Sequence, residues 1–154
     1  MGWGLRNAVG VAEHPVTGGV YSVENSCDQF TRDGTDIHED NPGEKCNFHG
    51  TLRDNKYAAQ GSSYGYPNCY AAFNATELPK NGNIVTGTLF ANSSKLDYLC
   101  KNYTAPVLTF EAHMAPLDIK FSKDGSVGFV TFHGSWYVPP RHPFILTLTA
   151  MLFT

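Results

Sequence analysis

An arginine and an asparagine stand directly before the first alternating apolar run of the chain, in the segment GLRNAVGV. The guanidinium of Arg6 presents a rigid fork of donors, and the Asn7 amide adds two more, so the pair suits a planar anion rich in oxygen. The same residues also fit an ordinary polar entrance to a strand, with Arg6 neutralised by a nearby aspartate. The residue types alone leave both interpretations open.

Other titratable residues gather in the segment DGTDIHEDNPGE, which contains hard oxygen ligands of the kind that Ca²⁺ binds. The EF-hand pattern fails there, because Thr35 and Ile37 occupy ligand positions, so a solvated loop rich in turns is the favoured interpretation. The spacing of His38, Cys46 and His49 does not predict a transition-metal site.

The elements that position these residues are predicted to be strands. The 154 residues include 15 Gly and 9 Pro scattered without a period, which favours many tight turns and an all-β fold. The segments AVGVAEHPVTGGVYSVENS and PLDIKFSKDGSVGFVTFHGS share one pattern: alternating strand, tight turn, alternating strand and polar exit. Their separation suits the repeats of a β-propeller better than a sandwich.

The region between the two repeats is predicted to be mostly loop. It is rich in Asp, Asn, Gly and Pro from Cys27 to Tyr70 and shows few periodic apolar positions. A short strand is expected at Ile84 and Val85, and no segment shows helical periodicity over three turns.

Net charge and cysteine usage indicate the class of partner and the cellular compartment of the protein. The net charge of −3 without a basic cluster argues against nucleic acid as a partner. The four cysteines lack CxxC spacing, so a disulfide between Cys69 and Cys100 is predicted, worth about 3–4 kcal/mol on the chain-entropy model. Cys27 and Cys46 are expected to be free thiols. Glycosylation sequons near that disulfide predict a secreted glycoprotein, and they begin at Asn74, Asn92 and Asn102.

The two ends of the sequence lead us to expect a fragment. The start MGWGLRN lacks the charged and apolar regions of a signal peptide, although the body predicts an extracellular protein. The apolar stretch 144–153 is too short to span a bilayer, so no membrane association is expected.

Four segments taken together resemble one family: GLRNAVGVAEHPVTGGVYSVENSCDQ, DIHEDNPGE, YGYPNCY and APLDIKFSKDGSVGFVTFHGSW. They are similar to the glucose/sorbosone dehydrogenases that depend on pyrroloquinoline quinone (PQQ), and most to the fungal pyranose dehydrogenases. The resemblance implies a secreted six-bladed β-propeller that binds PQQ and Ca²⁺ and oxidises a sugar at C1 or C2 by hydride transfer to the quinone. Residues 1–136 would form two to three of its blades with long loops, and 137–154 a non-homologous apolar tail.

The resemblance also implies roles for individual residues. Arg6 would contact the quinone oxygens and stabilise negative charge as hydride arrives, and Asn7 would hydrogen-bond the same cofactor. The backbone carbonyls of Ser26 and Cys27 would bind Ca²⁺, and Glu44 would support that loop.

This sequence also departs from the family pattern. The histidine that acts as general base in the family belongs to an earlier blade, and none of the six histidines here replaces it. The family reads GSWNR where this chain reads GSWYV, so the isolated chain is expected to be inactive. Electrons would pass to an acceptor such as a cytochrome domain of the parent protein. Two alternatives stay open: a secreted propeller-like module that binds carbohydrate or protein without redox activity, and a calcium-dependent lactone hydrolase.

Overall fold

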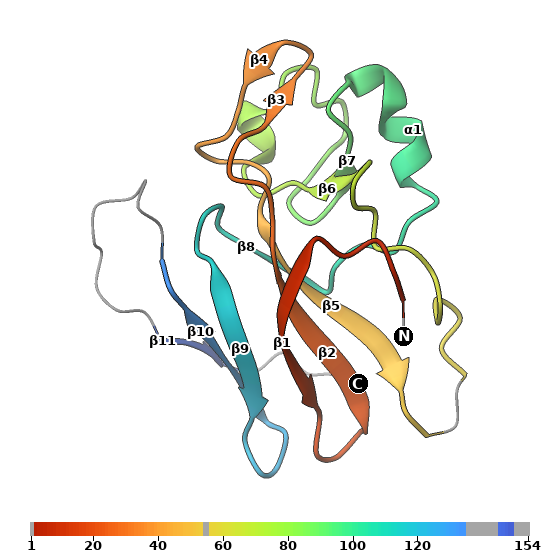
Figure 1. The fold of residues 1–154 in the computed structure, drawn as a ribbon, viewed down its shortest axis with the longest axis vertical. Helices are drawn as coiled ribbons and strands as arrows, with labels where there is room; N and C mark the ends of the chain where they lie inside the picture. The colour runs from red at the N-terminus through yellow and green to blue at the C-terminus, as the bar shows by residue number, and fades with distance from the viewer. Residues whose placement is uncertain (1, 54–55, 135–144, 150–154) are drawn as a thin grey trace.

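The computed structural model describes residues 2–53, 56–134 and 145–149, and these residues form mostly strands with little helix (Figure 1). The larger sheet is antiparallel and four-stranded in the order β1-β2-β5-β8. Its strands are β1 (Asn7–Glu13), β2 (Gly19–Asn25), β5 (Glu44–Thr51) and β8 (Leu108–Phe110). Strand β2 is central and almost completely buried, so it is the strand from which a site can be held rigidly.

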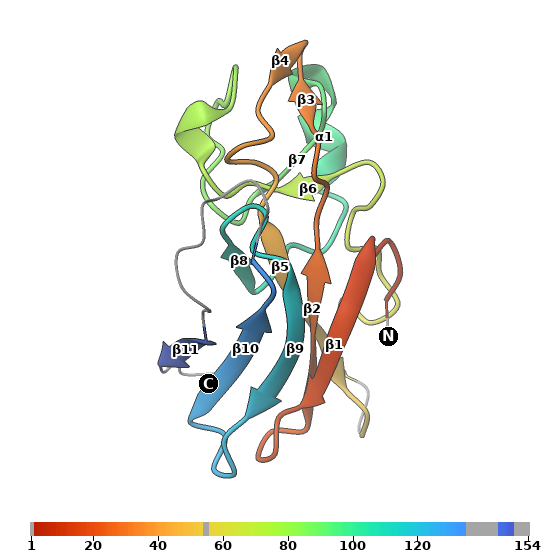
Figure 2. The same ribbon diagram turned by 60° about the vertical axis from the view of Figure 1, so that its left-hand side comes forward.

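A second, three-stranded sheet runs in the order β11-β10-β9. It contains β9 (Pro116–Phe121), β10 (Val127–Phe132) and β11 (Ile145–Thr149), and β9 packs beside β1 (Figure 2). The approach of these two strands requires a glycine, because a Cβ on Gly10 would lie 2.6 Å from the Cα of Asp118. The two sheets therefore meet where β1 carries its smallest residue.

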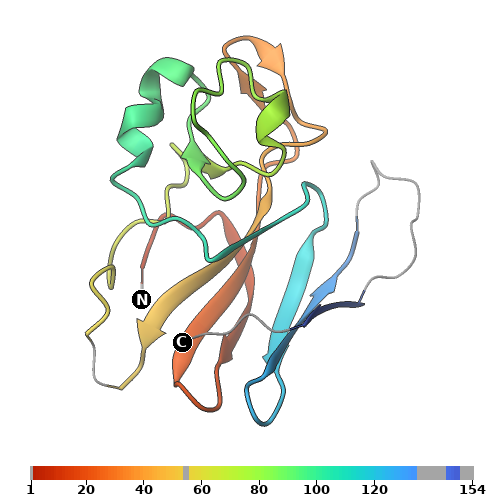
Figure 3. The same cartoon turned by 180° about the vertical axis from the view of Figure 1, so that it is seen from behind.

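A small lobe occupies one end of the sheets (Figure 3). It is built from short elements: β3 (Thr31–Arg32), β4 (Thr35–Asp36), β6 (Tyr70–Ala71), η1 (Ala75–Glu77), β7 (Leu89–Phe90), η2 (Ser94–Leu96) and α1 (Asp97–Cys100). A disulfide joins Cys69 to Cys100, whereas Cys27 and Cys46 are free thiols. Buried Arg32 makes a bidentate ion pair with Asp97 at 2.6 and 2.8 Å and so ties β3 to α1.

The two sheets share one hydrophobic core. Side chains from one face of the larger sheet pack against the second sheet, and the buried members are Tyr21, Val23, Cys46, Phe110, Ile119 and Val130. Burial of these side chains stabilises the contact between the sheets by roughly 1.5–3 kcal/mol for each large apolar residue. Among the described residues, no helix is long and apolar enough to cross a membrane.

The structure corrects two predictions made from the pattern. Strand β5 lies inside the region predicted to be loop, because its alternate residues are polar and yet buried. The strand expected at Ile84 and Val85 is wrong, since the Ile84 N–H donates to the carbonyl of Asn81 and closes a turn. Both repeated segments form the expected antiparallel hairpins. The boundary predicted after Trp136 lies outside the described residues, and 145–149 of the predicted tail pair with β10.

Candidate functional site

The start of β1 and the end of β2 bring Arg6 against a row of acceptors. The Arg6 backbone N–H donates to Glu24 Oε1 at 2.6 Å, and its Nη1 donates to the carbonyl of Asn25 at 3.4 Å and to that of Ser26. Its Nη2 lies 3.8 Å from Asp28 Oδ2, and about a third of the side chain is exposed. The sequence prediction placed Arg6 and Ser26 in one site, and the structure puts them in direct contact.

Glu24 is a fully buried carboxylate, and it accepts the hydrogen bond from the Arg6 backbone N–H. Its Oε2 accepts a hydrogen bond from Asn47 Nδ2 at 2.8 Å and lies 3.1 Å from Lys45 Nζ. The Lys45 ammonium, also buried, donates further to the carbonyl of Tyr64 at 3.2 Å. Every charge in this group is therefore paired and hydrogen-bonded, as burial requires.

Glu44, at the start of β5, links the two loops that border Arg6. Its Oε2 accepts the Ser26 N–H at 2.5 Å, and its Oε1 accepts the Ala115 N–H at 3.3 Å. Burial raises the pKa of this carboxyl to about 7, although the two backbone donors act in the opposite direction. Glu44 thus connects the end of β2 to the loop before β9.

His113, which the sequence prediction left out, lies beside Asp28 and contacts the backbone of His38. The Nδ1 of His113 is 3.9 Å from Asp28 Oδ1, and its Nε2 is 2.6 Å from the carbonyl of His38. That carbonyl accepts only from a protonated Nε2, so it fixes the tautomer of His113 when the ring is neutral. His38 Nδ1 in turn lies 2.7 Å from Asp36 Oδ1. The sequence pattern gave no signal for the contacts of His113 with His38 and Asp28, because these residues are far apart in the sequence.

The remaining predicted site residues border the same acceptors. Asn7 is exposed as the first residue of β1, and the free Cys27 thiol is half-buried beside Tyr70. Burial, with Cys27 as a second cause, raises the pKa of the Tyr70 hydroxyl, which donates to the carbonyl of Pro67 at 3.0 Å. The site therefore combines exposed N–H donors with backbone carbonyls and the exposed carboxylate of Asp28.

The acidic segment after β2 does not converge on one point. Hydrogen bonds from Ser94 and Ser93 lower the pKa of Asp33 to about 2, and Asp36 binds His38. In the part of the chain that the structure describes, no group of three or more His, Cys, Asp or Glu side chains is arranged to hold a metal. A cation at this end would therefore depend on the carbonyls that follow β2.

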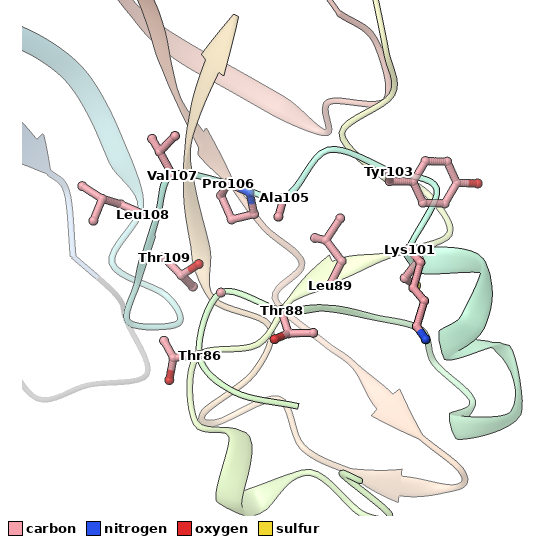
Figure 4. Close-up of a pocket in the computed structure, with 12 residues that line it drawn as sticks. Thr86, Thr88, Leu89, Lys101, Tyr103, Ala105, Pro106, Val107, Leu108 and Thr109 are labelled. Carbon is pink, nitrogen blue, oxygen red and sulfur yellow. The ribbon is translucent and has the colours of Figure 1, made fainter. Parts of the chain in front are cut away.

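A separate pocket of about 720 Å³ lies between β7 and β8 (Figure 4), and neither Arg6 nor any of its hydrogen-bond partners lines it. Its walls carry threonine hydroxyls, an amine and one aromatic ring together with apolar side chains; the polar members are Thr86, Thr88, Thr109, Lys101 and Tyr103. These groups can bind a polar ligand, but they do not form an acid–base or nucleophilic pair.

The comparison with known families identifies the family of this chain. A family model described as TrAA12-like matches residues 1–149. The chain belongs to the TrAA12-like family. The family predicted from the four segments is thereby confirmed, and the members that it matches are PQQ-dependent sugar and pyranose dehydrogenases.

Two relatives illustrate the extent of the match. A PQQ-dependent sugar dehydrogenase of Hypocrea jecorina is 49% identical over 140 residues, which cover 88% of this chain and 32% of the relative. A PQQ-dependent pyranose dehydrogenase of Coprinopsis cinerea is 36% identical over 152 residues, covering 91% of this chain and 20% of the relative. The chain thus spans a third or less of the length of the relatives it matches.

Solved structures show the same fold in this family. A calcium structure of a family AA12 carbohydrate-active enzyme from Trichoderma reesei superposes with a TM-score of 0.81 at 49% identity, over 88% of this chain and 34% of that one. The holo form of the pyranose dehydrogenase PQQ domain from Coprinopsis cinerea gives a TM-score of 0.76 at 34% identity, with coverage of 88% and 34%. The strand arrangement described above is therefore that of the AA12 family.

Proposed function

We propose that this chain is part of a PQQ- and Ca²⁺-dependent sugar dehydrogenase, and that the end of the larger sheet bearing Arg6 is its share of the cofactor site. The observation that supports this most strongly is the position of Arg6. Its backbone N–H is held by the fully buried carboxylate of Glu24, and its partly exposed guanidinium donates to the carbonyls of Asn25 and Ser26, in a chain of the AA12 family.

The donors at this end suit PQQ. When bound, PQQ supplies a quinone that accepts a hydride from the sugar at C1 or C2. Arg6 would offer a charged donor fork, and exposed Asn7 an amide, to quinone oxygens on which negative charge develops, which is an efficient form of electrostatic stabilisation. Glu24 fixes the Arg6 backbone, and the carbonyls of Asn25 and Ser26 accept from its guanidinium, so both ends of the residue are held at this end of the sheet.

The acceptors suit Ca²⁺. The carbonyls of Ser26 and Cys27, with the exposed Asp28 carboxylate near them, are hard oxygen donors of the type that Ca²⁺ prefers. The Ser26 carbonyl already accepts from Arg6, and a second lone pair on that oxygen stays available to a cation. Glu44 holds the Ser26 N–H and so keeps this loop in place.

We infer that the two sheets are successive blades of a six-bladed β-propeller, with β1 and β9 as neighbouring strands of different blades. The packing of β1 against β9 and the shared core support this arrangement. The match to 34% of the length of a solved PQQ domain corresponds to two blades of six.

The same proposal places the parent protein outside the cell, where the Cys69–Cys100 disulfide is stable. Its substrate would be a pyranose or a related sugar, and its electron acceptor a cytochrome domain or another redox partner. The isolated chain would bind PQQ but would not turn over, because it spans only a third of the relatives that carry the activity.

Titration of the purified chain with PQQ, in the presence and absence of Ca²⁺, tests the proposal. The change in PQQ absorbance reports binding, and dye reduction with a panel of pyranoses reports turnover. We expect saturable binding that Ca²⁺ strengthens, without sugar-dependent dye reduction. A chain that is folded by circular dichroism and binds no PQQ would contradict the assignment of the site, and robust turnover would contradict the predicted inactivity.

The pocket between β7 and β8 favours one alternative, a module that binds carbohydrate or protein without redox activity. Its hydroxyl groups and Lys101 amine could hydrogen-bond a saccharide, and Tyr103 offers a ring face for stacking. Saccharide binding that Lys101→Ala abolishes in the absence of PQQ would support this alternative.

A further inference from the structure

The segment formed by η2 and α1 presents apolar side chains to solvent. Leu96, Tyr98 and Leu99 expose 42%, 63% and 37% of their surface. Leu96 and Leu99 also line a pocket of about 190 Å³, and Asn92 lines it with them. The other walls of this pocket are mostly apolar and come from neighbouring loops: Phe30, Pro67, Asn68, Cys69, Tyr70 and Ala91.

The sequons differ in how their asparagines are held. Asn92 and Asn102 stand on either side of the η2–α1 segment, and both are exposed. The structure gives neither carboxamide a hydrogen-bond partner within the ranges that it describes. Asn74, in contrast, is half-buried: its Nδ2 donates to Asp40 Oδ2 at 3.4 Å, and its Oδ1 accepts from Thr76 at 2.6 Å. The nitrogen that glycosylation modifies is therefore accessible at Asn92 and at Asn102.

We propose that Asn92 carries an N-linked oligosaccharide whose first N-acetylglucosamine packs into this pocket over Leu96 and Leu99. The modification forms a bond between Asn92 Nδ2 and C1 of the sugar. The bond between C1 and the phosphate oxygen of a lipid pyrophosphate-linked donor breaks, the lipid pyrophosphate leaves, and the amide gives up one proton. No electrons are exchanged, and the donor and its transferase belong to the secretory pathway.

The pocket suits one sugar ring in size and in character. Its volume of about 190 Å³ corresponds to roughly six water molecules at about 30 Å³ each, which is the scale of a single pyranose. The C–H face of the ring and the methyl of the acetamido group are apolar, so they remove Leu96 and Leu99 from water. The sugar hydroxyls stay at the open side, where they remain hydrated.

Asn102 provides a matched comparison within the same lobe. It follows α1 and is exposed, but it does not line the pocket that Asn92 borders. A glycan at Asn102 would extend into solvent without covering the two leucines. Only the first N-acetylglucosamine on Asn92 would therefore pack against Leu96 and Leu99.

The test is hydrogen exchange on the full chain secreted from a eukaryotic host behind an added export signal. Glycopeptide mass spectrometry first establishes occupancy at Asn92 and Asn102. An endoglycosidase then leaves a single N-acetylglucosamine on the asparagine, whereas an amidase removes the whole glycan by hydrolysing the side-chain amide and leaves aspartate, which gives the two forms to compare. We expect amide exchange within 93–100 to be slower by roughly threefold or more in the form that keeps the single sugar.

Two variants sharpen the test. Asn92→Gln should give the fast exchange of the fully deglycosylated protein, and Asn102→Gln should keep the slow exchange. An Asn92 that leaves the secretory pathway unmodified would overturn the proposal. Equal exchange in the single-sugar and sugar-free forms would overturn it as well, and so would protection that depends on Asn102.

Discussion

The two hairpins of the molecule have similar sequences but different surroundings. β1–β2 and β9–β10 share the alternating pattern, and their turns touch, since His14 Nε2 lies 3.0 Å from the carbonyl of Gly125. Strand β2 lies between two strands and is buried along its length, whereas β10 is buried fully only at Val130. Strand β2 of the first hairpin therefore buries polar side chains such as Ser22 and Glu24, whereas the polar side chains of the second hairpin stay at least partly exposed.

That difference shows where a functional site can form. At the end of the first hairpin, buried Glu24 positions Arg6 and is itself matched by Lys45. In the second hairpin, Asp118 pairs with Lys120 at 3.3 Å, but this pair lies at the surface, with 45% of the Asp118 side chain and 71% of the Lys120 side chain exposed. A donor whose backbone is tied to a buried, fully paired carboxylate is held more rigidly than an exposed pair, as a binding site requires.

The largest expected effect comes from neutralising the buried carboxylate. Glu24→Gln leaves the Lys45 ammonium buried without a countercharge, so we expect the free energy of unfolding to fall by about 3–5 kcal/mol. The matched change in the second hairpin, Asp118→Asn, should cost about 1 kcal/mol or less, because that pair is exposed.

Urea unfolding at constant m-value measures both changes. The double variant Glu24→Gln with Lys45→Met should recover most of the loss, since no unpaired charge then stays buried. Equal, small effects of Glu24→Gln and Asp118→Asn would remove the distinction drawn between the hairpins.

The next largest effect concerns the hydrophobic core that the two hairpins share. Val23 and Val130 are both completely buried in the core between the sheets. Truncation of either to alanine removes two methyl groups and leaves a cavity, so each should cost about 2 kcal/mol of unfolding free energy. The midpoint of thermal or urea unfolding reports this change. A nearly neutral Val130→Ala beside a costly Val23→Ala would show that the second hairpin does not pack against the first.

The smallest effect concerns the two turns. Gly18 and Gly125 have φ angles of +69° and +74°, so alanine at either costs about 1 kcal/mol of backbone strain. A Cβ on Gly125 would also lie 2.3 Å from Cε1 of His14, whereas the nearest atom at Gly18 is 3.6 Å away. We therefore expect Gly125→Ala to destabilise the protein by about 1 kcal/mol more than Gly18→Ala. Calorimetric midpoints decide this, and a reversed order would mean that His14 is not held against the second turn.

The hairpins were predictable because alternation and glycine turns are local signals. Strand β5 was not, because Lys45, Asn47 and His49 alternate on a buried face where a pattern reading expects solvent. Their burial depends on partners such as Glu24, which only the folded sheet brings to them. The available signal for strand β5 was the alternation itself, in which polar Lys45, Asn47 and His49 occupy every second position.

The candidate site was partly predictable for a similar reason. Arg6 and Ser26 were predicted as site residues because they stand at the two ends of one hairpin motif. In the structure the Arg6 guanidinium donates to the Ser26 carbonyl. Asp28 lies close to Ser26 in the sequence, but its histidine neighbour, His113, comes from the loop before β9. No local pattern contains that contact.

The central claim is that Arg6 provides the cofactor-binding donor of this chain. Equilibrium titration of PQQ in the presence of Ca²⁺ tests it on the native chain, Arg6→Ala and Arg53→Ala. Arg53 serves as the control because it is an exposed arginine beyond Thr51, at the end of β5 opposite Glu44. Loss of a charged hydrogen bond of about 1.5–3 kcal/mol should weaken PQQ binding by roughly 10- to 100-fold in Arg6→Ala. Arg53→Ala should bind like the native chain. Equal PQQ affinity in Arg6→Ala and the native protein would contradict the account.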